Sequence, residues 1–432
     1  MIPGVSIAGR RALEAYWLER MRAHVADLAT RSPWYRERLN GFNVDGPQEW
    51  EDLLALPLTT KDEFARHNEQ FLAVPSTQVV DHTSTSGSTG EPVPFLLTEN
   101  DLRRLAENEA LSLATAGITR SDTVQITTTL DRRFMAGLAY WLGLRRIGAG
   151  VVRSGPGDPR GQWDLMLASG TTALIAVPSF LLRLLHEWHR TGLDPRRTSV
   201  RRVVCIGEPI GDGQGGPNLL ARRILDRWDI ALHGTYASTE MATAFTEPIP
   251  FQGHRVPHQL ALTEVLDDEG RPVPEGVVGE LTATPFGVEG MPLLRYRTGD
   301  MCVWSGHQDI VGHYTMMLGP VVGRKEQRMK VKGTTLYPQQ VIDALNGEET
   351  VRRFVVLREK DELGLDTVHV LVDADPSTLE RSAARLRHRL RVLPILEVAD
   401  PAHIERLIQD PHKRKTSLFI DRGENNDQLR RP

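Results

Sequence analysis

The middle of the chain alternates short apolar runs with longer amphipathic segments, and this alternation limits the possible folds more than any other feature. The apolar runs occupy residues 123–130, 148–154, 173–179 and 201–208. Runs of this length are typical of buried strands, and the segments between them are typical of helices that pack on the sheet. The sequence therefore predicts an α/β fold with helices layered on a largely parallel sheet.

The regions on either side follow different patterns. Apolar residues at helical spacing predict an amphipathic packing helix over residues 10–32. Strands separated by Gly and Pro predict a β-rich subdomain after Gly253. Beyond Gly323 a charged stretch leads into a further pattern, which predicts strands at 352–359 and 367–373 and a helix at 379–390. We therefore expect a small α+β C-terminal domain, with a boundary near Glu326 that divides the chain into residues 1–325 and 326–432.

The charge balance argues against a general polyanion-binding role. Lys and Arg total 52 against 56 Asp and Glu, so no basic field attracts nucleic acid or anionic lipid. The longest apolar stretch, around residues 174–185, is interrupted by Pro178 and Arg183 and is shorter than the roughly 20 residues of a membrane span. The first residues lack a secretory pattern, and Cys205 and Cys302 are the only cysteines. We expect a cytoplasmic protein with no nucleic-acid or membrane partner.

Residues 83–92, TSTSGSTGEP, combine hydroxyl side chains with two glycines. Glycine lets the backbone approach an anion closely, and hydroxyls and amides donate to phosphate oxygens. We expect a helix to begin after this loop and to add a partial positive charge. The chain contains no GK[ST] motif, which disfavours P-loop chemistry. From composition alone, a phosphate loop and a Ser/Gly-rich surface loop remain equally open.

Two other patterns are interpreted as structural. Residues 211–216, GDGQGG, have the glycine spacing of a dinucleotide fingerprint, but four residues separate them from the preceding strand, so we interpret them as a loop. His186 and His189 lie three apart on a predicted helix without a third ligand nearby. A solvated helix face is therefore favoured over a zinc site.

Four motifs occur in a fixed order along the chain. They are TSTSGSTGEP at 83–92, TYASTE at 235–240, LLRYRTGD at 293–300 and GRKEQRMKVKGTTLYPQQV at 323–341. In this order the sequence resembles the phenylacetate-CoA ligase branch of the AMP-forming adenylating enzymes, over about residues 30–421. Residues 32–39 and 56–64 also resemble N-terminal segments of that branch. The resemblance implies a large adenylating domain followed by a mobile C-terminal lid.

The resemblance also implies an ATP site. The residues that it assigns to the β- and γ-phosphates are Ser86, Gly87, Ser88, Thr89 and Gly90. Tyr236 would flank adenine, Thr239 would contact the α-phosphate, and Glu240 would hold Mg²⁺, which prefers oxygen ligands. Ala237 stands where the family usually has glycine. The residues assigned to the adenine edge and the bottom of the acid pocket are Gly207, Glu208 and Pro209.

The resemblance also assigns residues to the ribose contact, to the hinge of the C-terminal domain and to catalysis. Asp300 would accept both ribose hydroxyls with its two oxygens, and Arg324 would also contact the ribose. Glu326 matches the hinge position, where the family commonly has Asp or Lys. Lys415 matches the catalytic lysine by its spacing to Asp421, with Lys413 as a neighbouring rival. Such a lysine would neutralise charge as the acid and the α-phosphate meet.

These assignments predict that the protein joins an aromatic carboxylic acid to coenzyme A, with ATP and Mg²⁺, through an acyl-AMP intermediate. The acid pocket would involve residues 131–141, and the candidates in and around it are Asp131, Phe134, Tyr140, Gly207 and Ala237. Phe134 aligns with a pocket aromatic of the family, and the charged residues 131–133 hint at a ring that bears amino or hydroxyl groups. The family's common state implies a homodimer.

Two other functions remain open from the sequence. The adenylate could instead pass to a carrier-protein thiol, to an amine, or to an acceptor such as nitrite in diazo formation. A non-catalytic nucleotide-binding regulator would keep the ATP site without the chemistry. The joint presence of Glu240, Asp300 and Lys415 disfavours such a regulator.

Overall fold

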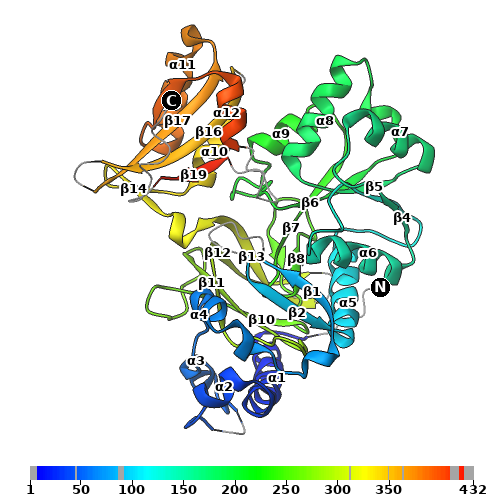
Figure 1. The fold of residues 1–432 in the computed structure, drawn as a ribbon, viewed down its shortest axis with the longest axis vertical. Coiled ribbons are helices and arrows are strands. Elements are labelled where there is room, and N and C mark those ends of the chain that lie inside the picture. Colours follow the sequence, from blue (N-terminus) through cyan, green and yellow to red (C-terminus); the bar gives the residue numbers. More distant parts are fainter. Residues whose placement is uncertain are drawn as a thin grey trace. The chain divides into compact units, whose positions relative to one another are not determined.

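The computed structural model describes residues 7–43, 46–85, 92–310, 313–348, 350–361, 364–408 and 418–422. The chain divides into two compact units, Met1–Val321 and Val322–Pro432, which run from blue to yellow and from yellow to red in Figure 1. Within the described ranges, no helix has both the length and the apolar character that crossing a bilayer requires.

Helices open the first unit. α1 (Arg10–Arg31) buries one apolar stripe, Trp17 among it, which confirms the helix predicted over residues 10–32. It ends at Ser32, whose hydroxyl accepts a hydrogen bond from the Tyr35 amide and so caps α2 (Pro33–Arg38). The other elements of this part are α3 (Trp50–Ala55), α4 (Lys61–Arg66) and the 3-10 turns η1 (Asn68–Phe71) and η2 (Ser76–Gln78).

An eleven-stranded sheet forms the centre of the first unit. Five neighbouring strands, in the order β4, β3, β5, β6 and β7, run parallel, as the sequence predicted. Their bounds are β3 (Thr123–Ile126), β4 (Gly150–Arg153), β5 (Ala173–Ala176), β6 (Arg202–Ile206) and β7 (Ala231–Ser238). Between them lie α6 (Met135–Ile147), α7 (Pro159–Ser169), α8 (Pro178–Arg190), η3 (Pro195–Arg197) and α9 (Leu219–Leu225).

The central strands are buried on both faces. In β5, Leu174 and Ala176 join an apolar cluster with α7, α8 and α9, whereas Ala173 and Ile175 join a cluster with α6 and α5 (Glu99–Thr115). Successive side chains of a strand point to opposite faces of the sheet. Because helices cover both faces, a central strand such as β5 is apolar throughout and does not alternate with polar residues.

Six further strands extend the sheet beyond β7, in the order β8, β9, β13, β12, β11 and β10. Their bounds are β8 (Thr243–Thr246), β9 (His254–Arg255), β10 (Ala261–Leu266), β11 (Val278–Pro285), β12 (Tyr296–Ile310) and β13 (His313–Arg324). β8 reverses direction and pairs antiparallel with β7, and β11 pairs antiparallel with both β10 and β12. This region is the β-rich subdomain predicted after Gly253.

The Ser/Gly-rich loop joins two strands rather than a strand and a helix. β1 (Val79–Ser84) and β2 (Pro94–Thr98) pair antiparallel on either side of it. β2 buries the alternate residues Phe95 and Leu97, and α5 begins only after it, where the Thr98 hydroxyl accepts from the Asp101 amide. The expectation that a helix directly follows the loop is therefore wrong, because a buried strand lies between them.

The second unit contains a four-stranded sheet in the order β18, β17, β16 and β19. The predicted strands at 352–359 and 367–373 lie within β16 (Val351–Lys360) and β17 (Asp366–Ala374), and the helix predicted at 379–390 lies within α11 (Pro376–Leu390). The other elements are η4 (Lys325–Gln327), β14 (Met329–Val331), β15 (Thr334–Leu336), α10 (Pro338–Asn346), β18 (Ile395–Val398), α12 (Pro401–Ile408) and β19 (Phe419–Asp421). Apolar residues of α10 and α11 pack on β16 and β17 to form its core.

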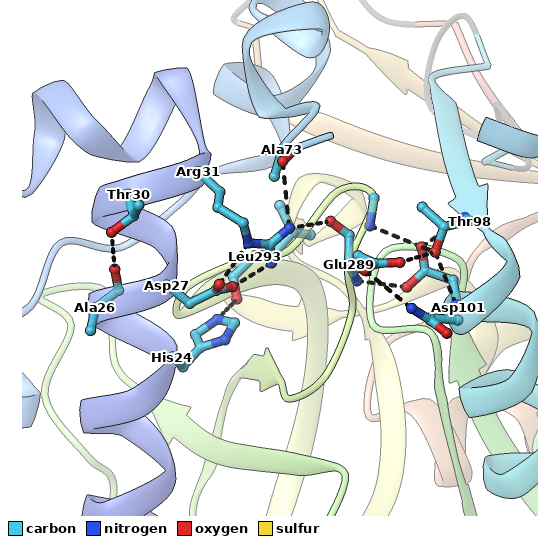
Figure 2. A network of polar contacts seen from close by, with 12 residues as sticks. His24, Ala26, Asp27, Thr30, Arg31, Ala73, Thr98, Asp101, Glu289 and Leu293 are labelled. Atoms are coloured by element: carbon cyan, nitrogen blue, oxygen red, sulfur yellow. Dashed lines mark hydrogen bonds and ion pairs between the residues drawn. The ribbon is translucent and has the colours of Figure 1, made fainter. Parts of the chain in front are cut away.

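A polar network fixes the segment that leads into β12 (Figure 2). The Asp101 carboxylate, in the first turn of α5, accepts hydrogen bonds from the amides of Glu289 and Gly290 at 2.6 and 2.9 Å. Arg31 of α1 pairs with Asp27 and donates to the Glu289 carbonyl at 3.1 Å. Two helices that are far apart in the sequence thus hold the chain just before the LLRYRTGD motif.

Arg295 is a buried residue of that motif and pairs with Glu264 of β10. The two side chains are 1% and 4% exposed, and both carboxylate oxygens accept from the guanidinium, at 2.9 and 2.8 Å. Arg295 Nη1 also donates to the carbonyls of Leu54 and Leu56 at 2.6 and 2.7 Å. One side chain therefore joins β10, the start of β12 and the end of α3.

We predict that Glu264→Gln lowers the free energy of unfolding by about 3–5 kcal/mol, because the Arg295 cation stays buried without a counter-charge. All eight tryptophans lie before residue 322, so urea unfolding followed by tryptophan fluorescence reports on the first unit. The control is Asp164→Asn, which removes an exposed pair with Arg160 and should cost less than about 1 kcal/mol. Equal losses in the two variants would contradict the prediction.

Candidate active site

Three predicted site segments follow parallel strands at the ends where those strands stop. Phe134 lies in the connection after β3, Gly207 comes directly after β6, and Tyr236 lies near the end of β7. β3, β5, β6 and β7 are parallel neighbours, so their carboxyl ends share one edge of the sheet. Ligands of open α/β sheets bind at this edge.

Tyr236 and Asp300 meet although 64 positions separate them in the sequence. The Tyr236 hydroxyl donates to Asp300 Oδ2 at 2.7 Å. Burial and the Asp300 charge raise the pKa of Tyr236 well above its usual value of 10, so the phenol keeps its proton and acts as the donor. Asp300 is 9% exposed. The structure thus brings together the residues predicted for adenine and ribose.

Glu240 and Tyr296 form a second contact between the same two motifs. The Tyr296 hydroxyl donates to Glu240 Oε1 at 3.1 Å, and Glu240 is 8% exposed. Thr239, beside Glu240, lies in the turn between β7 and β8, where its carbonyl accepts from the Ala242 amide. Each motif therefore supplies a tyrosine to the carboxylate of the other. Sequence reasoning missed Tyr296, although its place four residues before Asp300 in the motif was a usable signal.

Glu240 suits a magnesium ion that is held mainly by phosphates. Mg²⁺ commonly binds one or two carboxylates together with substrate phosphate oxygens and water. Among the residues that the structure describes, no group of three or more His, Cys, Asp or Glu side chains could hold a metal ion by itself. One carboxylate at this edge of the sheet therefore fits a cation that arrives with ATP.

The turn after β6 is fixed by its neighbour α8. Gly207 has a φ of 75°, a left-handed conformation that glycine adopts without strain. The Glu208 carboxylate accepts hydrogen bonds from the amide and hydroxyl of Ser179, at 2.8 and 2.7 Å, in the first turn of α8. Pro209 follows, and its carbonyl accepts from the Asn218 amide group at 2.8 Å. The predicted adenine-edge segment is thus held from both sides.

The predicted acid segment begins with a strained turn. Arg132 and Arg133 both have left-handed φ values, 56° and 57°, which is unusual for two successive residues with side chains. The Arg133 carbonyl accepts from the Ser84 amide at 3.3 Å, so this turn meets the last residue of β1, which lies within the Ser/Gly-rich stretch 83–92. Asp131 is exposed, and Phe134 directly precedes α6. The connection after β3 and the start of the predicted phosphate loop therefore lie together.

The other predicted residues that the structure describes lie on several different elements. Arg324 ends β13, and Glu326 lies in η4. Tyr140 is buried in α6, and Ala237 is exposed in β7. The predicted residues that lie outside the described ranges are Ser86, Gly87, Ser88, Thr89, Gly90, Lys413 and Lys415.

A protein-family model described as AMP-binding enzyme matches residues 50–288, which is more than half of the chain. This chain belongs to that family. A phenylacetate-coenzyme A ligase of Thermus thermophilus is 30% identical over 346 residues, which cover 78% of this chain and 76% of the relative. A phenylacetate-coenzyme A ligase of Aromatoleum evansii is 27% identical over 428 residues, 94% of each chain.

Solved structures support the same placement at the level of the fold. The crystal structure of 2-hydroxyisobutyryl-CoA ligase in the postadenylation state matches with a TM-score of 0.81 at 20% identity, and covers 96% of this chain and 91% of its own. These comparisons confirm the predicted fold class and the predicted resemblance to phenylacetate-CoA ligases.

We predict that Asp300→Asn weakens MgATP binding about tenfold or more, because the amide loses one charged acceptor for the ribose diol. Isothermal titration calorimetry measures this Kd directly. The matched control is Tyr236→Phe, which removes the partner hydroxyl at 2.7 Å but keeps the ring and the carboxylate, and should change the Kd less than about threefold. Equal effects of the two substitutions would mean that Asp300 serves mainly to hold Tyr236.

Proposed function

We propose that this protein is an AMP-forming ligase that adenylates an aromatic carboxylic acid with ATP and transfers the acyl group to coenzyme A. The observation that carries the proposal is the pair of reciprocal contacts, Tyr236 with Asp300 and Tyr296 with Glu240, which join two motifs at the carboxyl edge of the parallel strands. Membership of the AMP-binding enzyme family and the likeness to two phenylacetate-coenzyme A ligases support the same reaction.

The first half-reaction overcomes the poor reactivity of a carboxylate. Its negative charge resists nucleophilic attack, whereas the mixed anhydride with AMP carries a good leaving group. Asp300 would hold the ribose, Tyr236 would lie against adenine, and Thr239 would contact the α-phosphate. Glu240 would hold Mg²⁺, which would supply positive charge to stabilise the departing pyrophosphate. The residues at 86–90 would donate to the same pyrophosphate oxygens.

The second half-reaction needs access for a thiol. We propose that the C-terminal domain, residues 326–432, turns about Glu326 so that one active site first closes over ATP and then admits CoA. Lys415 would bridge the acid carboxylate and the α-phosphate in the first step only. Arg324, just before the hinge, would contact the ribose.

Phe134 is the proposed aromatic wall of the acid pocket, since it follows the strained turn at the carboxyl end of β3 and directly precedes α6.

ATP and CoA are both available in the cytoplasm, where we expect the enzyme to act. A homodimer stays a prediction from the family resemblance.

We expect an aromatic acid to support exchange of labelled pyrophosphate into ATP in the absence of CoA, because adenylation is reversible and needs no thiol. The measurement uses benzoic, phenylacetic and cinnamic acids and their ring-substituted forms, with an acid-free reaction as the control. AMP release that depends on CoA then identifies the acceptor. Absence of exchange with every acid would contradict the proposal.

Lys415→Ala should abolish pyrophosphate exchange but largely preserve thioester formation from CoA and a chemically prepared acyl-AMP, because the lysine would act only in the first step. Lys413→Ala is the matched control and should retain both activities. Equal loss of the two half-reactions in Lys415→Ala would argue against its assignment, and loss of exchange in Lys413→Ala alone would transfer the role to Lys413.

A further inference from the structure

Glu109 is a carboxyl group buried without adequate partners. It lies in α5 and is 3% exposed. Its Oε1 accepts a long hydrogen bond of 3.3 Å from Asn108 Nδ2, and its Oε2 has no hydrogen-bond partner in the part of the chain that the structure describes. Burial raises the pKa of Glu109 to about 8, with the nearby Ser112 hydroxyl opposing the shift. Whether protonated or ionised, the group leaves a buried polar atom unsatisfied, which native proteins rarely tolerate without a reason.

The neighbouring helix α6 approaches α5 closely at Glu109. A Cβ atom at Gly143 of α6 would lie 2.5 Å from the Glu109 Cβ, so only glycine fits this close approach of the two helices. Tyr140 lies one turn earlier on α6 and is 5% exposed. The Glu109 charge, together with burial, raises the pKa of Tyr140 well above 10. Glu109 therefore lies beside a residue that we assign to the acid pocket.

A line of hydroxyl groups runs from this position to the edge of the sheet. Ser112 Oγ lies 2.7 Å from Thr246 Oγ1 of β8, which in turn lies 2.9 Å from Thr235 Oγ1 of β7. Thr235 directly precedes Tyr236. Besides three leucines, α5 also buries the polar residues Asp101, Arg104 and Asn108. The contact of α5 with β8 and β7 thus has a polar part that ends next to the proposed adenine site.

We propose that Glu109 determines the specificity for the acid, by hydrogen bonding to an amino or hydroxyl group on the aromatic ring. Such a group both donates and accepts, so it satisfies the orphaned oxygen of Glu109 in either protonation state, whereas hydrogen or methyl satisfies neither. The substrate class is then an aromatic acid with a polar ring substituent. This inference rests on the proposed function and names the substrate class of the same site.

The first test compares ring-matched acids on the wild-type enzyme. Benzoic and phenylacetic acids are each assayed unsubstituted and with methyl, amino or hydroxyl groups at the meta and para positions, and kcat/KM is measured from AMP release. We expect at least one amino or hydroxyl acid to exceed its methyl counterpart by about tenfold or more, since a site built to bond a polar group discriminates strongly against analogues that lack it. Equal use of methyl and polar acids would overturn the inference and leave the ligase proposal intact.

The second test removes the carboxyl group. Glu109→Val should abolish the preference for the polar acid, leave kcat/KM for the methyl acid equal or higher, and leave the KM for ATP unchanged. Glu109→Gln keeps the shape and some hydrogen bonding, so it should keep an intermediate preference. The control is Glu107→Gln on the same helix, where the side chain is 54% exposed and the preference should not change. A preference that survives both Glu109 substitutions would overturn the inference, and AMP release with none of the acids would overturn the ligase proposal and this inference together.

Discussion

The geometry of the first unit depends on a positive charge buried in its interior. Arg295 is satisfied only where the two oxygens of Glu264 and the carbonyls of Leu54 and Leu56 converge, so the start of β12 has one position. The polar network around Asp101 holds the chain just before it (Figure 2). These two contacts therefore fix the positions of the residues that β12 carries to the edge of the sheet.

The anchored strand β12 also orients two carboxylates, those of Asp300 and Glu240. Asp300 accepts from Tyr236 and Glu240 accepts from Tyr296, so each is held by a neutral donor before any nucleotide arrives. A carboxylate oxygen has more than one lone pair, which leaves acceptor capacity for a ribose or a metal ion beside the tyrosine. Groups that are already ordered lose less freedom on binding. In the proposed nucleotide site, this order would favour binding without a large rearrangement of these side chains.

Glu109 differs from these two carboxylates because its burial costs stability without a full set of hydrogen bonds in return. An apolar side chain would suit the contact between α5 and α6 better, yet Glu109 buries a carboxyl there whose Oε2 has no partner among the described residues. Sites that break local rules without compensation within the fold are where function is expected. A ring substituent of the acid supplies the missing partner in our proposal.

The sequence by itself determined the layered fold and the identity of the motifs. The apolar runs marked the parallel strands because helices bury both of their faces, as Leu174 and Ile175 on opposite sides of β5 show. Tertiary structure alone decided which motif residues meet. The contact of Tyr296 with Glu240 and the burial of Glu109 against α6 both depend on segments that are distant in the chain. Local periodicity reports burial, but the partner of a buried polar group is set by packing that no local pattern encodes.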